Sequence, residues 1–288
     1  MERTGRLDRQ AAAAAQVTPE NLDPYLTELQ SRVGSVTVHG SIYKLRRTAE
    51  LISPSINLGW LSELEKDLAL VMQPRSKFDR LVLTEVLVEA GLTLMKEAEL
   101  SARGDIKRAC TARNGLMVAL LAVHPIRLKN FAGLEIGRSF VDIGNSWWII
   151  LTKQETKSRR PDERRVPDFL SPAIHAYLRW YRPVLARGRH PPAALWLSAN
   201  DGSPMNYDGV EHAISETTRS AVGVNVCPHL FRMAGASTAA IYAGDMPHLG
   251  SGILSHSDPR VTDEHYNFAS SVNAGKVYAE IIRAEYLE

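Results

Sequence analysis

The chain has 288 residues, a formal charge of +2 and a pI of about 8.5, which allows one large domain or two modest domains that each bury a core. This charge is too small to indicate a nucleic-acid partner by itself, so any basic surface must come from local clustering. Cys110 and Cys227 lack metal-ligand spacing and argue against a disulfide framework. No apolar run approaches the ~20 residues of a membrane span, and we expect a cytoplasmic protein with no membrane partner.

Residues 1–17 predict a flexible arm, because they are charged and contain a run of five alanines rather than the apolar core of a secretory signal. Residues 18–72 predict a helical domain. Its amphipathic helices are expected at residues 24–33, 37–52 and 61–71. The polar stretch at residues 73–78 predicts a linker to the rest of the chain.

The second of these helices concentrates positive charge. Tyr43, Lys44 and Arg47 place one aromatic ring and two cations on it, which suits contacts to the phosphates and groove wall of a nucleic acid. Lys44 and Arg47 lie three apart and share a side of the helix, which favours them over Arg46. An ordinary solvated helix face explains the same residues equally well.

Residues 79–288 predict a larger domain that is mainly helical with a small antiparallel sheet. Helices are expected at residues 79–99, 105–122, 127–134, 172–181 and 207–221. Residues 147–153 predict a strand, with residues 164–167 as its hairpin partner. Gly223 is expected to end the last of these helices.

A helix that begins at proline follows. Pro228 suits a first helical position, so His229 and Arg232 share a face of the first turn, where free N–H groups attract an anion. Together with Arg127, Arg232 would supply a pair of guanidinium groups, which stay ionised and match the oxygens of a phosphate. Such a pair can stabilise the transition state of phosphoryl transfer without a metal.

Asp258 and Pro259 repeat this start signal, which places Tyr266 about two turns into a further helix and His256 just before its cap. Tyrosine is a demanding nucleophile, because its reference pKa of about 10 makes deprotonation at pH 7 cost roughly 4 kcal/mol. A neighbouring base or cation must offset that cost.

These segments resemble the tyrosine recombinase family, also called phage integrases. Residues 254–267 look like its LGH…T…Y box, His229–Arg232 like its HxxR box, and Arg127 like its first arginine. The resemblance covers residues from about 80 to 270 and extends more weakly to the first domain, which it identifies as a core-binding domain. Three positions depart from the family pattern: Ser255 replaces a glycine, Asn130 an acidic residue, and Met233 a histidine or aspartate.

The resemblance implies site-specific DNA strand exchange through a 3′-phosphotyrosine, as in integration of a mobile element. Because the covalent intermediate conserves the bond energy, neither a cofactor nor a metal is needed. The implied catalytic residues are Arg127, Lys157, His229, Arg232, His256 and Tyr266. The implied partners are double-stranded DNA, further copies of the chain in a homotetramer on two DNA sites, and accessory DNA-bending or directionality proteins, which implies a nucleoid-associated protein.

The lysine has two candidates, since the family carries it on a β-hairpin and both Lys153 and Lys157 follow a threonine here. Lys157 is the better match to the family's Thr-Lys pair. Either lysine could instead be an ordinary solvated charge of the hairpin.

Two other functions remain open: a type IB topoisomerase, which uses similar chemistry on one duplex, and a DNA-binding relative that has lost catalysis and acts as a regulator. The intact arginine, histidine and tyrosine positions argue against the second. In the tail, apolar residues recur at helical spacing over residues 277–286 and predict a terminal docking helix. It would dock on its own catalytic domain or, by the resemblance, on the next subunit.

Overall fold

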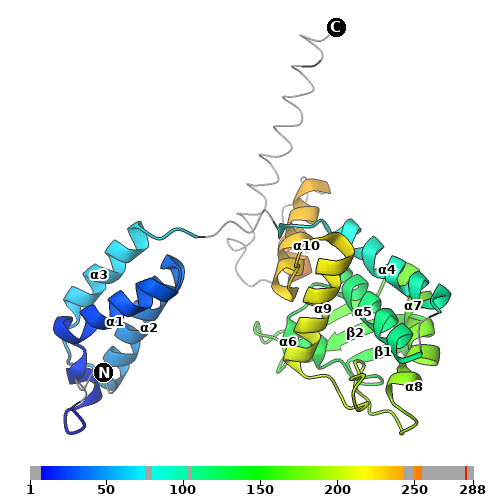
Figure 1. Cartoon of the computed structure of the whole chain (residues 1–288), viewed down its shortest axis with the longest axis horizontal. Helices are drawn as coiled ribbons and strands as arrows, with labels where there is room; N and C mark the ends of the chain where they lie inside the picture. The colour runs from blue at the N-terminus through cyan, green and yellow to red at the C-terminus, as the bar shows by residue number, and fades with distance from the viewer. Residues whose placement is uncertain (1–7, 75–79, 103–104, 243–248, 255–282, 284–288) are drawn as a thin grey trace. The chain divides into compact units, whose positions relative to one another are not determined.

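The computed structural model describes residues 8–74, 80–102, 105–242, 249–254 and 283 (Figure 1). The chain divides into two compact units, residues 1–77 and 78–288. The described residues are mostly helical, with one three-stranded antiparallel sheet, so the predicted fold class is confirmed. None of the described helices is long and apolar enough to cross a membrane.

The described part of the smaller unit contains three α-helices: α1 (Pro19–Arg32), α2 (Ser35–Ile52) and α3 (Gly59–Leu70). α1 begins earlier than predicted, because the Thr18 side chain caps it by accepting a hydrogen bond from the Asn21 amide and Pro19 occupies its first turn. The apolar stripes of the three helices form one core around Ile42 and Leu61, both fully buried.

A short 3-10 helix, η2 (Ala13–Gln16), precedes α1. Ala14 is buried and joins the core of the smaller unit. This part of the predicted flexible arm is therefore folded.

The larger unit follows the chain through these elements: α4 (Thr84–Leu100), α5 (Asp105–Val123), α6 (Leu128–Ala132), β1 (Phe140–Ile143), β2 (Ser146–Leu151), β3 (Asp162–Arg165), η4 (Asp168–Leu170), α7 (Ser171–Ala176), the π-helical turn η5 (Tyr177–Tyr181), α8 (Arg182–Leu185), α9 (Tyr207–Val222), α10 (Pro228–Tyr242) and α11 (Leu249–Leu254). The predicted helix at residues 172–181 is thus part of a longer helical run. Pro183, which cannot donate a backbone hydrogen bond, follows its wider π turn.

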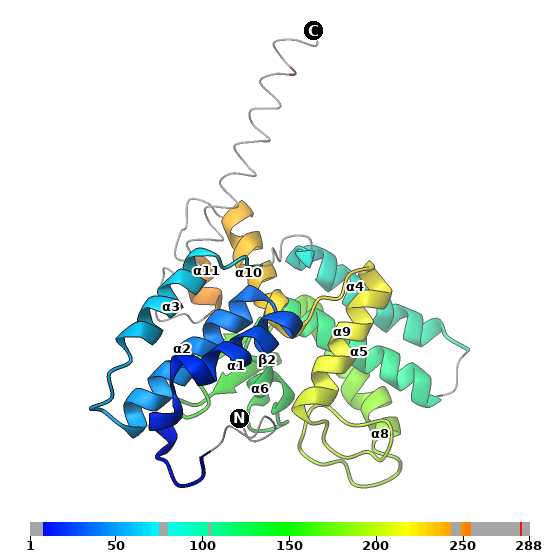
Figure 2. The same cartoon turned by 60° about the vertical axis from the view of Figure 1, so that its left-hand side comes forward.

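Helices α4, α5 and α9 lie side by side (Figures 1 and 2). α4 and α5 cross with their backbones in contact, since a Cβ added at Gly91 would lie 2.5 Å from the carbonyl oxygen of Gly115. α9 begins at the predicted position because the Asn206 side chain accepts a hydrogen bond from the Gly209 amide. It ends before Gly223, whose φ of 75° is the left-handed conformation that suits glycine.

The sheet has the order β1-β2-β3, with both pairs antiparallel. Its second pair is the predicted hairpin, in which Ile149 of β2 lies opposite Arg164 of β3. β1 joins β2 through Gly144 and Asn145, whose φ values of 59° and 65° form a two-residue turn. Strand β1 was not predicted from the sequence.

Aromatic residues fix the core of the larger unit. Trp196 is fully buried, and its indole N–H donates to the Phe131 carbonyl at 2.8 Å. The buried Tyr177 hydroxyl donates to the Leu195 carbonyl at 2.9 Å. These bonds tie α6 and the π turn to the segment before α9, so α6, which follows Arg127, is fixed on the core.

Candidate active site

Arg127 stands at the start of α6, with extended backbone angles that make it the N-cap residue. Its side chain is half-buried, whereas Pro125 and Ile126 before it are buried. The predicted helix at residues 127–134 is therefore shorter, and Gly133 forms its C-cap. The buried neighbours hold the arginine at a defined place on the surface of the core.

Arg232 lies on α10, which begins at Pro228 as predicted. It is half-buried, and His229 on the same first turn is exposed. The Arg232 guanidinium donates to the Pro125 carbonyl at 2.5 Å and to the Leu254 carbonyl at 2.7 Å. It thereby joins α10 to the segment that carries Arg127 and to the end of α11.

The two predicted arginines come together, and a third joins them. The pKa of Arg232 is lowered to about 10, first by burial and then by the positive charges of Arg127 and Arg164. The negative charge of Asp162 acts in the opposite direction. Three guanidinium groups from distant parts of the sequence thus share one partly buried region.

Arg164 was not predicted as a site residue. Its Nε and Nη2 donate to the two carboxylate oxygens of Asp162, each at 2.8 Å, and its Nη1 donates to the Ile253 carbonyl at 2.7 Å. Asp162 and Arg164 are two apart on β3 and so point to the same face of the sheet. Their cross-strand partners on β2, Leu151 and Ile149, are buried. A charged pair on the core-facing side of a strand is the signal that could have identified them.

His124 lies next to this pair and was also missed. Burial, followed by the positive charge of Arg164, lowers the pKa of His124 to about 4, although a hydrogen bond to the backbone of Arg165 and the charge of Asp162 oppose the shift. Its Nε2 has no hydrogen-bond partner among the described residues. The imidazole is therefore neutral at physiological pH.

Lys153 and Lys157 are both exposed in the connection between β2 and β3. Glu155 fastens the start of this connection, accepting hydrogen bonds from the Thr152 amide and from Arg138, each at 2.9 Å. Both lysines are thus presented at the surface, and the choice of Lys157 stays a prediction.

The remaining site predictions fall elsewhere. His256 and Tyr266 lie outside the described residues, as do residues 258 and 259 and, apart from residue 283, the predicted docking helix.

Tyr43, Lys44 and Arg47 belong to α2 of the smaller unit, where all three are exposed. Arg46 is instead held by Glu65 at 2.7 Å and by Glu50 at 2.6 Å. Arg47 also reaches Glu50, at 2.8 Å. Both arginines thus have carboxylate partners, and DNA contact by Tyr43, Lys44 and Arg47 stays a prediction.

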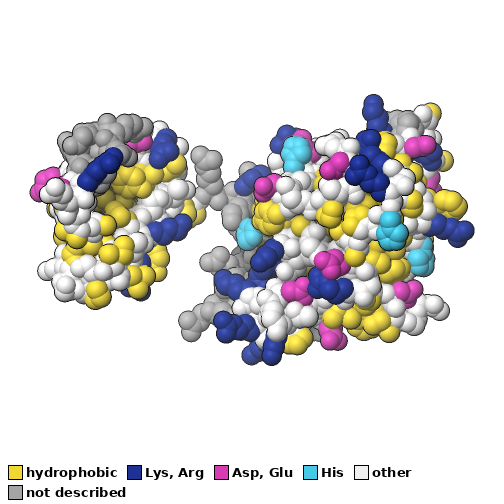
Figure 3. All heavy atoms as spheres, turned by 90° about the horizontal axis from the view of Figure 1, so that it is seen from below, with side chains coloured by type: hydrophobic (Ala, Val, Ile, Leu, Met, Phe, Trp, Pro, Cys, Tyr) yellow, Lys and Arg dark blue, Asp and Glu magenta, His cyan; other side chains and the backbone are white. Residues whose placement is uncertain are grey.

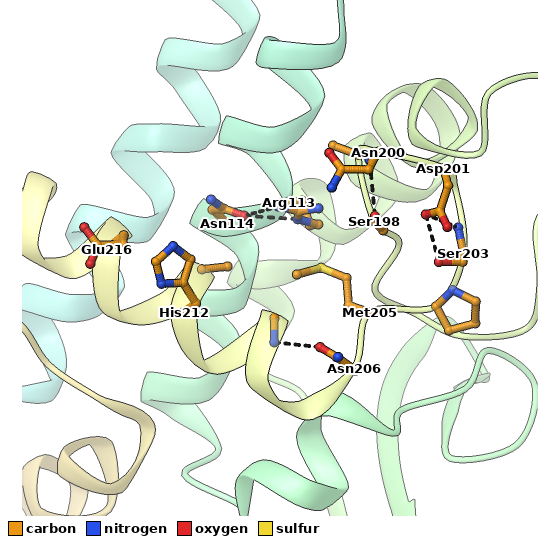
Figure 4. A pocket seen from close by; sticks show the side chains of 14 residues that line it. Arg113, Asn114, Ser198, Asn200, Asp201, Ser203, Met205, Asn206, His212 and Glu216 are labelled. Carbon is orange, nitrogen blue, oxygen red and sulfur yellow. Dashed lines mark hydrogen bonds between the residues drawn. The ribbon is translucent and has the colours of Figure 1, made fainter.

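A polar pocket of about 650 Å³ lies between α5, α9 and residues 198–206, and none of the predicted site residues lines it (Figure 4). Arg113 is buried beside it. Its Nε and Nη2 donate to the Asn114 side chain at 3.0 and 2.9 Å, and its Nη1 donates to the Leu197 carbonyl at 2.7 Å. The bond to Leu197 attaches α5 to the segment before α9, which is a structural role.

Basic side chains are unevenly distributed on the larger unit. On the face seen in Figure 3, Lys and Arg side chains gather along one edge of the larger unit, and acidic and basic side chains are mixed elsewhere. Local clustering, rather than the formal charge of +2, gives this unit a basic region. Within the described ranges, no three His, Cys, Asp or Glu side chains gather as a metal site requires.

No protein-family profile matches the sequence, and no curated protein matches it. Among solved structures, the chain is similar to the XerH site-specific recombinase bound to a difH substrate before cleavage, with a TM-score of 0.58 and 16% identity over 96% of this chain and 75% of that chain. XerH bound to a palindromic difH substrate after cleavage gives 0.52 and 13% over 86% and 73%. The XerA recombinase gives 0.46 and 17% over 89% and 80%.

The two XerH structures show that this chain has the fold of the tyrosine recombinases, as the resemblance of its sequence boxes predicted.

Proposed function

We propose that this protein is a site-specific DNA recombinase that cuts and rejoins double-stranded DNA through a 3′-phosphotyrosine on Tyr266. The observation that carries the proposal is the convergence of Arg127, Arg164 and Arg232. Arg232 donates to the Pro125 carbonyl, two residues before Arg127, and Arg232 and Arg164 donate to the neighbouring carbonyls of Leu254 and Ile253. Bringing like charges together out of water is unfavourable, and an anion bound there would offset it. A phosphodiester fits, because guanidinium donors match its oxygens.

In the proposed reaction the phenol oxygen of Tyr266 attacks the scissile phosphorus in line. His229 accepts the phenol proton, the bond from phosphorus to the 5′-oxygen breaks, and that oxygen takes a proton from Lys157. The products are a 3′-phosphotyrosine and a 5′-hydroxyl. Attack by the 5′-hydroxyl of another strand reverses these steps and rejoins the DNA.

Charge builds up on the non-bridging oxygens as the phosphorus becomes five-coordinate. Arg127 and Arg232 hold these oxygens, and His256 donates a further hydrogen bond to one of them. Fixed donors stabilise the transition state without reorganising during the reaction.

In this proposal residues 18–72 form a core-binding domain, residues 73–78 a linker and residues 79–288 the catalytic domain. Tyr43, Lys44 and Arg47 contact the DNA. Exchange between two duplexes requires a tetramer bound to two DNA sites. The terminal helix would hold the subunits of this tetramer together by docking on the next subunit. Accessory DNA-bending or directionality proteins would act on this assembly, in the cytoplasm at the nucleoid.

The test begins with the DNA site, which can be selected from a pool of randomised duplexes with the Tyr266→Phe variant. This variant lacks only the nucleophilic oxygen, so it should bind DNA as the unaltered protein does. A nicked suicide duplex built on the selected site should then give a DNA-linked band on a denaturing gel with the unaltered protein and none with Tyr266→Phe.

Each other result decides between the alternatives. Binding without any covalent band from the unaltered protein would indicate a DNA-binding relative that has lost catalysis. A band that persists in Tyr266→Phe would show that another residue is the nucleophile. Relaxation of supercoiled DNA by single protomers, without exchange between sites, would indicate a topoisomerase.

A further inference from the structure

Two arginines hold the same end of α11. Arg164 donates to the Ile253 carbonyl and Arg232 to the Leu254 carbonyl, each at 2.7 Å. The last carbonyls of a helix have no partner within it and carry the negative end of its dipole, so they suit guanidinium donors. Leu254 is the last described residue of α11, and His256 follows two residues later in the sequence.

Arg164 is itself held in one orientation. The Asp162 carboxylate accepts two parallel hydrogen bonds from the Arg164 guanidinium. The Asp162 side chain is only 16% exposed and the Arg164 side chain only 10%. This bidentate pairing fixes the plane of the guanidinium and directs Nη1 to Ile253. Arg165 alternates to the other face of β3, where it is 49% exposed and pairs with Asp168 at the surface.

We propose that Arg164 is a positioning residue of the site: oriented by Asp162, it anchors the C-terminal end of α11 and so fixes where the chain that carries His256 and Tyr266 leaves the arginine cluster. The inference rests on the proposed function, in which Arg232 binds the phosphate. Because Arg232 and Arg164 hold neighbouring carbonyls, loss of Arg164 shifts the approach of the nucleophile while Arg232 still binds the phosphate.

Single-turnover cleavage of the suicide duplex, measured beside affinity for a half-site, tests this role. Arg164→Gln should slow cleavage on the order of 10²-fold, as a misplacement of about 1 Å can, with half-site affinity unchanged. Asp162→Asn keeps the size of the side chain and one acceptor, and should give a smaller loss in the same direction. Arg165→Gln is the matched control from the same strand and should cleave normally.

Hydrogen exchange of the DNA-free protein gives a second measurement that does not depend on activity. Exchange over residues 249–254 should become faster in Arg164→Gln and stay unchanged in Arg165→Gln, because only the first removes a bond to the end of α11. Thermal unfolding checks that each variant folds. If Arg164→Gln does not fold, Asp162→Asn carries the same comparison.

Unchanged exchange over α11 overturns the anchor, even if cleavage is slow. Equal losses of cleavage and half-site affinity overturn the positioning role in favour of general damage to the DNA-binding surface. If the unaltered protein forms no complex linked through Tyr266, the proposed function fails instead, and the exchange measurement still decides whether Arg164 anchors α11.

Discussion

Arg113 and Arg232 are both arginines that the larger unit withdraws from water, and burial is the largest cause that lowers the pKa of each guanidinium. Their surroundings differ. Arg113 donates to the neutral oxygens of Asn114 and Leu197 beside a polar pocket (Figure 4). Arg232 also donates to carbonyls, but the charges of two other arginines lower its pKa further.

The comparison shows that burial of an arginine does not by itself indicate a functional site. A guanidinium that is satisfied by neutral oxygens can serve to join two elements of a fold. A cluster of like charges adds repulsion that folding does not require, so it is the stronger sign of a binding site for an anion.

The largest expected effect separates these two arginines. Arg232→Lys should slow cleavage on the order of 10³-fold or more, by analogy with arginines in phosphoryl transfer. Lysine keeps the charge but cannot replace the planar donor fork. Arg113→Lys should instead reduce the free energy of unfolding by about 1–3 kcal/mol, because the oxygens that Arg113 satisfies lose donors, while the folded fraction still cleaves.

Single-turnover rates and urea unfolding of the two variants check this prediction. Cleavage by Arg232→Lys within about tenfold of the unaltered protein, against the loss expected for a phosphate-binding arginine, would contradict its role. Loss of cleavage by fully folded Arg113→Lys would show that the polar pocket belongs to the site.

Burial cannot distinguish the two lysines, since Lys153 and Lys157 are both exposed, and only their chemistry can. A general acid contributes on the order of 10²-fold or more, and it becomes dispensable when the leaving group needs no proton. Lys157→Ala should therefore lose cleavage of ordinary DNA and recover it on a 5′-bridging phosphorothiolate duplex. Lys153→Ala serves as the control, and rescue of that variant instead would move the assignment to Lys153.

His124, which the charge of Arg164 affects, adds a pH dependence to the stability of the larger unit. Its pKa is lowered to about 4 in the folded protein from an ordinary value of 6.5, so the unfolded chain binds the proton more readily. Neutral His124 therefore contributes to the free energy of unfolding in full above pH 6.5, its ordinary pKa, and this contribution is lost as the pH falls toward 4. By linkage, the loss between about pH 7 and pH 4 amounts to about 3 kcal/mol.

Urea unfolding over this pH range, compared between the unaltered protein and His124→Gln, isolates that contribution from those of the carboxylates. The variant should show a shallower decline in the free energy of unfolding as the pH falls. Parallel declines in the two proteins would mean that His124 is not held neutral by its surroundings.

Local signals predicted much of the fold. Gly223 predicted the end of α9 and Pro228 the start of α10, because helix ends depend on a few neighbouring residues. β1 was missed because it is a short strand, with little sequence signal of its own. The Gly144-Asn145 turn becomes recognisable as a hairpin turn only once β1 is paired with β2.

The site divides in the same way. Arg127 and Arg232 could be chosen from sequence boxes, and the structure brings them together. Arg164 could not, because its importance depends on which face of β3 points inward and on the Ile253 carbonyl far along the chain. The contact between Arg164 and the Ile253 carbonyl depends on tertiary packing. The local sequence gives only a weak signal of it, which is a charged pair at alternate positions of the strand.

The smallest effect is expected in the smaller unit, where a paired and an exposed cation can again be compared. Arg46 is held by two carboxylates, and Lys44 on the same helix is exposed. A cation that contacts DNA phosphate releases counterions, so Lys44→Gln should reduce the slope of log affinity against log salt by about 0.9. Arg46→Gln should leave that slope unchanged, because Glu50 and Glu65 already neutralise its charge. Affinity of the Tyr266→Phe protein for its selected duplex, measured over a series of salt concentrations, gives both slopes. An unchanged slope in Lys44→Gln would make this side of α2 an ordinary solvated helix face.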